Sequence, residues 1–170
     1  MKNNLVKLIR ISAVVLLTIM AAQNAINAQD KGASGASLQS ANRIVGAWET
    51  TVTFRNCETG EQLGPPVNGV STYSEGGTMS EFAANPATPY RTPGHGIWVS
   101  NIGGSYSMKF SFLPLTPAGA PIGRMRVSQE MELPRFSDEF TSSGSFVLTN
   151  FAGVVLATGC STAVGVRLQF

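Results

Sequence analysis

The sequence holds little of the chemistry that metal sites and most catalytic centres need. Its 170 residues include one histidine, His95, and two cysteines, Cys57 and Cys160. A zinc site takes three or four ligands from His, Cys or carboxylates, and the two cysteines are better explained as a pair. No Gly-x-Ser-x-Gly elbow precedes a helix, and no stretch matches a P-loop. We therefore expect no metal site, no hydrolase elbow and no phosphate-binding loop.

Charge is also scarce, at 13% of the chain. The 12 Lys and Arg residues exceed the 10 Asp and Glu, but Lys2, Lys7 and Arg10 lie in residues 1–28, which hold no acid. Without these three bases, nine basic residues face ten acidic ones, a net charge of −1. The rest of the chain has no basic run, so the electrostatic footprint of a nucleic-acid binder is missing. We expect no nucleic-acid partner.

No apolar run reaches the roughly 20 residues that a membrane-spanning helix needs. The apolar segment Ile11–Ala22 follows a basic start and precedes the polar stretch NAINA, which is typical of a secretory signal. We interpret residues 1–28 as a signal peptide cleaved after Ala28, with an uncleaved anchor as the alternative. The prediction is a secreted or periplasmic protein with no stable membrane anchor after cleavage.

The next segment, residues 29–42, is rich in Ser, Ala and Gly and has no aromatic residue. This composition is typical of a flexible linker. The remaining segment, residues 43–170, has the length of one domain. It is long enough to bury a core without a metal.

Export also decides how the cysteines are interpreted. In an oxidising compartment two cysteines are expected to form a disulfide, here Cys57–Cys160. In the chain-entropy model a bridge closing so long a loop stabilises the fold by about 4–5 kcal/mol. The pair lacks the C-x-x-C spacing of redox centres. Two free thiols or a redox pair remain the alternative.

The domain alternates apolar and polar residues, and turn sequences punctuate it. The one long connection, Ala83–Gly94, is rich in proline; it is a candidate lid or a passive connection. The other connections are short, which favours sequential antiparallel neighbours. The predicted strands are Trp48–Arg55, Asn68–Ser74, Thr78–Phe82, Gly96–Ile102, Ser105–Leu113, Ile122–Leu133, Glu139–Thr149 and Val154–Phe170.

Eight such strands can close on themselves, which removes the exposed sheet edges. Closure brings the first strand beside the last, where Cys57 and Cys160 have to meet, so the disulfide and the barrel support each other. We predict an all-β, eight-stranded antiparallel up-and-down barrel with one disulfide. A two-sheet sandwich is the structural alternative.

A Gly-x-Trp, Gly46 and Trp48, opens the first strand of this exported chain. In this respect the sequence resembles the lipocalins and the wider calycin group, over about Ile44–Phe170. The resemblance implies that Trp48 closes one end of the barrel and that a basic residue of the last strand, Arg167, packs across it. It extends to small exported lipocalin-like bacterial barrels. The Thr-Asp-Tyr motif of true lipocalins is absent, so the resemblance points to a calycin-type barrel.

The alternation also predicts which side chains face the interior. Apolar faces are expected to point inward, because an unpaired interior charge carries a desolvation cost of several kcal/mol. An eight-stranded barrel of this kind is either filled by its side chains or holds one small ligand. The candidate lining residues are Trp48, Tyr106, Met108, Phe110, Phe112, Met125, Val127, Met131, Phe140 and Phe146.

Candidate catalytic residues are weak. His95, Glu81 and Tyr106 offer a proton donor or acceptor for a cyclase or isomerase of calycin shape. His95, between two glycines, is alternatively a rim residue or an axial haem ligand. We predict a non-catalytic barrel that binds a small hydrophobic molecule and needs no cofactor. The alternatives are the cyclase or isomerase, and a filled barrel that acts as a protein-interaction scaffold with a protein partner as yet unknown.

Overall fold

The computed structural model describes residues 43–83 and 90–170. The predicted signal peptide and linker, and half of the candidate lid (residues 84–89), lie outside the described residues. Within them the chain is all-β and contains no helix. The strands are β1 (Gly46–Arg55), β2 (Val67–Ser74), β3 (Thr78–Ala83), β4 (Gly94–Ser100), β5 (Ser105–Phe112), β6 (Arg124–Glu132), β7 (Glu139–Thr149) and β8 (Val155–Arg167).

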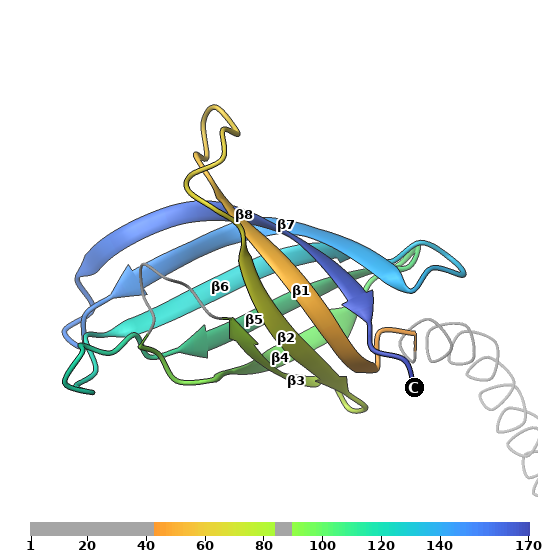
Figure 1. Cartoon of the computed structure of the whole chain (residues 1–170), viewed down its shortest axis with the longest axis horizontal. Coiled ribbons are helices and arrows are strands. Elements are labelled where there is room, and N and C mark those ends of the chain that lie inside the picture. Colours follow the sequence, from red (N-terminus) through yellow and green to blue (C-terminus); the bar gives the residue numbers. More distant parts are fainter. Residues whose placement is uncertain (1–42, 84–89) are drawn as a thin grey trace, which may run out of the picture. The chain divides into compact units, whose positions relative to one another are not determined.

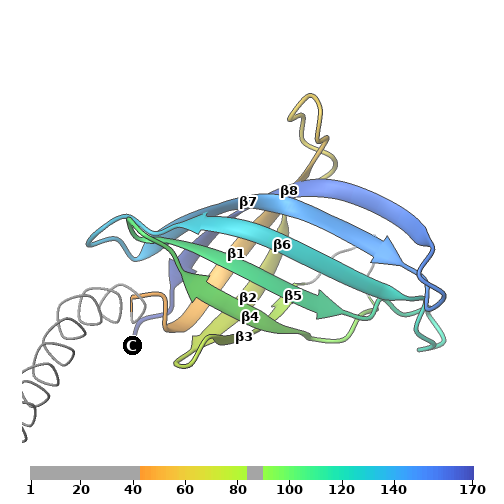
Figure 2. The same ribbon diagram turned by 180° about the vertical axis from the view of Figure 1, so that it is seen from behind.

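The eight strands form one closed antiparallel barrel in sequence order, which confirms the predicted fold and excludes the sandwich. Each strand pairs with its neighbours in the chain, and β1 also pairs with β8. Figure 1 shows β1 between β2 and β8, and Figure 2 shows the β4–β7 wall from the other side. The predicted strand bounds differ from the observed ones by a few residues; β8, for example, ends at Arg167 rather than Phe170.

The closing seam carries the disulfide. Arg55 is paired with Cys160 across β1 and β8, and Cys57 lies two residues further on, where the chain leaves β1. Cys57 and Cys160 are bonded, with their Cα atoms 5.2 Å apart and 103 positions apart in sequence. The predicted disulfide is therefore confirmed. A disulfide is typical of proteins that function in an oxidising environment, outside the cell or in the periplasm.

The interior of the barrel has two halves, one towards each end. We call the end where β1, β3, β5 and β7 begin the Trp48 end, and the opposite end the Arg91 end. The main buried cluster lies towards the Trp48 end, because most of its members stand near the starts of odd strands or the ends of even ones. Its members are Ile44, Trp48, Tyr73, Met79, Trp98, Tyr106, Met108, Met131, Leu133 and Phe140.

A candidate binding cavity inside the barrel

The indole of Trp48 is the centre of the packed half. Its exposed fraction is 0%, and its Nε1–H donates to the carbonyl of Ile44 at 2.9 Å. Its ring packs against that of Phe140, with centroids 5.0 Å apart. The side chain is therefore both fully packed and fully hydrogen-bonded, as a buried tryptophan requires.

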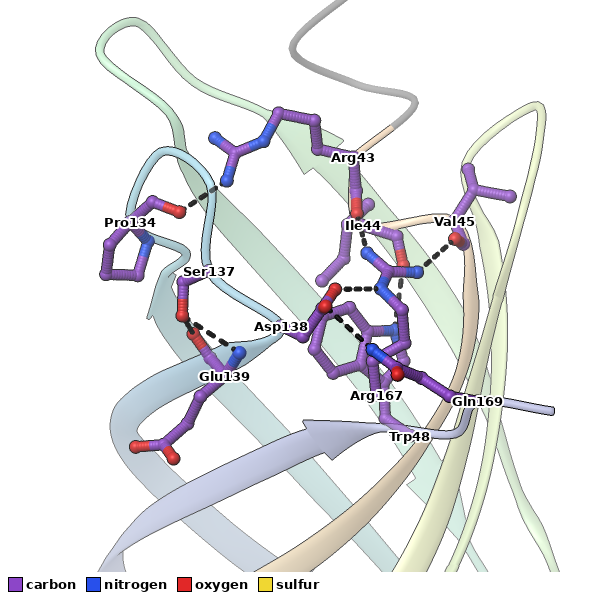
Figure 3. Close-up of polar contacts among 10 residues, drawn as sticks. All are labelled: Arg43, Ile44, Val45, Trp48, Pro134, Ser137, Asp138, Glu139, Arg167 and Gln169. Carbon is purple, nitrogen blue, oxygen red and sulfur yellow. Dashed lines mark hydrogen bonds and ion pairs between the residues drawn. The ribbon is translucent and has the colours of Figure 1, made fainter.

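Arg167 covers the outer side of this indole, as Figure 3 shows. Its guanidinium carbon lies 4.2 Å from the centre of the Trp48 ring. Its nitrogens donate to the carbonyl of Val45 at 2.9 Å, to the carbonyl of Arg43, and to Oδ1 of Asp138 at 2.9 Å. One side chain of β8 thus holds the chain that enters β1 and the turn that enters β7.

The position two residues before Trp48 requires glycine for a steric reason. Gly46 has a φ of 138°, a region that residues with a Cβ rarely adopt. A Cβ at this position would also stand 2.7 Å from Nη1 of Arg167. The Gly-x-Trp spacing therefore lets the guanidinium approach the backbone while the indole is buried below it.

The other half of the interior contains a cavity of about 380 Å³. Its wall is mostly apolar, made of rings, thioethers and branched side chains from all parts of the barrel. The seven predicted lining residues that border it are Met108, Phe110, Phe112, Met125, Val127, Phe140 and Phe146. The other three, Trp48, Tyr106 and Met131, lie in the packed cluster and do not border the cavity.

Two charged side chains also border this cavity. Nη2 of Arg91 donates to Oε1 of Glu81, and the two side chains are only 7% and 9% exposed. The guanidinium carbon of Arg91 lies 3.4 Å from the centre of the Phe112 ring, and its Nε donates to the carbonyl of Thr92 at 3.1 Å. A cation and an anion therefore lie together in a mostly apolar wall.

Room for the Glu81 carboxyl comes from Gly94, its partner on β4. A Cβ on Gly94 would stand 2.0 Å from Oε1 of Glu81, so a larger residue there would displace the carboxyl. Burial raises the pKa of Glu81, and the nearby Arg91 and His95 lower it; burial is the larger influence. The carboxyl therefore holds a proton more tightly than a carboxyl in water.

A second polar group, without charge, lies on the β6–β7–β8 side. The amide of Gln129 accepts from Ser142 at 2.9 Å and donates to Ser161 at 3.1 Å. All three side chains are buried and border the cavity. They form a hydrogen-bonded row across three strands, so no charge is needed to satisfy them.

Tyr73 adds a hydroxyl to the cavity wall. Its O–H donates to Sδ of Met108 at 3.3 Å, and the side chain is almost fully buried. Burial is the main reason that its pKa is well above the usual range; a hydrogen bond with Ser71 lowers the pKa, and the charge of Glu81 raises it. The phenol therefore stays neutral at any ordinary pH.

The three candidate catalytic residues are not brought together. Glu81 borders the cavity, whereas His95 is exposed on the outer face, because its neighbour Gly94 is the residue that pairs with Glu81. Tyr106 is buried in the packed cluster, with its ring centre 5.9 Å from that of Trp98. In this register His95 does not reach a molecule held inside the barrel.

Sequence reasoning missed several cavity residues. Gln129 stands between Val127 and Met131 on the inward face of β6, and Ser142 comes two residues after Phe140 on the inward face of β7. The alternation of inward and outward positions could therefore have identified both residues. Arg91 lies outside every strand and gave no periodic signal.

No group of three or more His, Cys, Asp and Glu side chains in the described part of the chain is placed to hold a metal ion. Residues 43–83 and 90–170 also contain no helix long and apolar enough to cross a membrane. No protein-family model matches the chain, and no curated protein matches it. The geometry of the barrel therefore carries the functional argument.

Proposed function

We propose that this chain is an exported, lipocalin-like barrel that binds a small hydrophobic molecule in its interior without catalysis. One observation carries the proposal: a cluster of buried side chains fills the Trp48 end of the barrel, while the interior towards the Arg91 end contains a cavity of about 380 Å³ with a mostly apolar wall. Ligand sites are typically concave, mostly apolar and supplied with a few polar groups, and this cavity falls within their usual size of about 300–1,000 Å³.

The likeness to the lipocalins is supported by the closed antiparallel topology and by the stacking of Arg167 on Trp48. Export through residues 1–28 is supported by the disulfide, which persists in oxidising compartments. N-terminal sequencing of the protein recovered from the exporting cells tests this part. We expect the mature chain to begin at Gln29.

Binding is tested with Nile red, an uncharged dye whose fluorescence rises in apolar surroundings. Ala163 is buried on β8 and borders the cavity, and Val164, the next residue, is exposed. We expect wild-type protein to bind the dye, Ala163→Phe to bind it weakly because the new ring fills the space, and the matched Val164→Phe to bind it normally. Equal binding by both variants would place the dye outside the barrel and contradict the proposal.

A cyclase or isomerase is the second candidate, because Glu81 has a raised pKa and borders the cavity together with the Tyr73 hydroxyl. Catalysis would require a molecule retained in the cavity to be converted, and Glu81→Gln would abolish the conversion while binding persists. Native mass spectrometry before and after incubation separates the two functions, since a binding protein returns the same mass.

A further inference from the structure

The ionisable groups on the cavity wall set what the cavity can accept. Apart from the neutral phenol of Tyr73, the described wall has two, Glu81 and Arg91. They are bonded to each other, so the ionised pair has no net charge. All other polar groups of the described wall are hydroxyls and one amide. The described wall therefore carries several polar groups but no unbalanced charge.

The pair is also held by its surroundings. The Phe112 ring lies against one face of the Arg91 guanidinium, and Gly94 leaves just enough room for the Glu81 carboxyl. Movement of either charge towards a ligand would separate two ions in a low-dielectric site, at a cost of several kcal/mol. A charged ligand can therefore obtain a counter-ion from this pair only by breaking the bond between Glu81 and Arg91.

Hydrogen bonding remains possible without breaking it. Within the described residues, Arg91 uses Nε for Thr92 and Nη2 for Glu81, and nothing there accepts from Nη1. A guanidinium carries five N–H groups. A carbonyl or hydroxyl oxygen of a ligand can accept from this group, and a hydroxyl can donate to the carboxyl.

We propose that the cavity selects an uncharged amphipathic molecule, with an apolar chain against the rings and a neutral hydroxyl, amide or ester head group on the Glu81–Arg91 pair. This inference rests on the proposed function and narrows it. A carboxylate would compete with Glu81 for Arg91 and leave an unpaired anion, and an ammonium would leave an unpaired cation. Binding of either charged ligand therefore carries the desolvation cost of an isolated buried charge.

Three probes with the same chain test the inference: 1-decanol, decanoic acid and decylamine, each displacing Nile red from the disulfide-bonded mature protein at neutral pH. We expect 1-decanol to displace the dye at a concentration at least about tenfold lower than the other two, the ratio that about 1.4 kcal/mol produces. Equal potency, or a lead for the acid or the amine, overturns the inference.

Two variants test whether the pair sets the preference. Glu81→Gln leaves Arg91 as an uncompensated cation, so decanoic acid is expected to become the strongest displacer. The double variant Glu81→Gln with Arg91→Met removes both charges and should still prefer 1-decanol to the charged probes. The matched controls Glu132→Gln and Arg126→Gln change charge on the exposed face of β6 and should keep the wild-type order.

The failures are distinguishable. If wild-type protein does not bind Nile red at all, both the proposed function and the inference that rests on it are wrong. If the dye binds and the three probes displace it equally, the barrel binds ligands but the pair does not select them. The wild-type ranking decides the matter by itself if a variant does not fold.

Discussion

The two ends of the barrel each place an arginine on an aromatic ring, with opposite consequences. At the Trp48 end, Arg167 lies 4.2 Å from the indole centre and is bonded to two backbone carbonyls and to Asp138, whose side chain is 56% exposed. At the Arg91 end, the guanidinium lies 3.4 Å from the Phe112 ring centre and is bonded to a carboxylate that is 9% exposed.

The difference lies in what each arginine is bonded to. Arg167 donates its hydrogen bonds to backbone carbonyls and to an exposed carboxylate, so no second charge is buried beside it. These contacts hold segments of the chain together. Arg91 is buried together with an anion and borders the cavity. Burying two charges lowers stability, but it places them where they can select a ligand. The comparison predicts a structural role at one end and a binding role at the other.

The largest effect is expected from Trp48→Ala at the packed end. It removes a fully buried ring and its hydrogen bond to Ile44, and we expect a loss of about 3–5 kcal/mol in the free energy of unfolding. Phe146→Ala on the cavity wall should cost less, because that ring is only partly buried and borders an existing space. Urea denaturation measures both; a greater loss for Phe146→Ala would reverse the comparison.

The disulfide on the seam comes next. Replacing Cys57 and Cys160 together by serine is expected to lower the free energy of unfolding by about 2–5 kcal/mol, because the bridge constrains a long loop of the unfolded chain. Denaturation with and without a reductant gives the value. The double variant should be insensitive to reductant, and an unchanged stability of reduced wild type would contradict the prediction.

Arg167→Met should cost about 2 kcal/mol, because the carbonyls of Val45 and Arg43 lose a charged donor and the indole loses its cover. Thermal unfolding measures the loss. Binding of Nile red to the folded variant should be unchanged, since Arg167 does not border the cavity.

Arg91→Met should instead make stability depend on pH. The pKa of Glu81 is already raised by burial, and losing Arg91 raises it further. A carboxyl with a higher pKa in the folded than in the unfolded chain binds protons more tightly when folded, so stability falls as pH rises through that interval. We expect the loss relative to wild type to be at least about 1 kcal/mol greater near pH 8 than near pH 5.

The internal control for this variant is Glu81→Gln in the Arg91→Met background, which should abolish the added pH dependence. If the dependence survives in the double variant, a group other than Glu81 is its source.

The smallest effect is expected from Asp138→Asn. Asp138 accepts from Arg167 and from Gln169, but its carboxylate is mostly exposed, and exposed ion pairs contribute up to about 1 kcal/mol. The difference from wild type should shrink further in high salt. A loss as large as that of Arg167→Met would mean that the charge of Asp138, rather than the carbonyls, holds the arginine.

Local sequence patterns were sufficient to predict the architecture. Alternation and turn sequences located all eight strands, and the positions of Cys57 and Cys160 near the two ends of the domain anticipated the closing seam. Alternation also identified an inward face containing Met108, Phe110 and Phe112. It did not separate residues that fill the barrel from those that border the cavity, because Trp48 has the same parity as Phe54 on β1, and Met131 the same parity as Val127 on β6.

The sequence by itself therefore determined the class of fold, the strand order and the covalent link, because each depends on spacing along the chain. Only the tertiary structure decided that Glu81 meets Arg91, that His95 faces outward, and that the interior towards the Arg91 end contains a cavity. These depend on the register between strands and on how side chains from eight strands share one volume, and neither quantity is encoded in any single stretch of sequence.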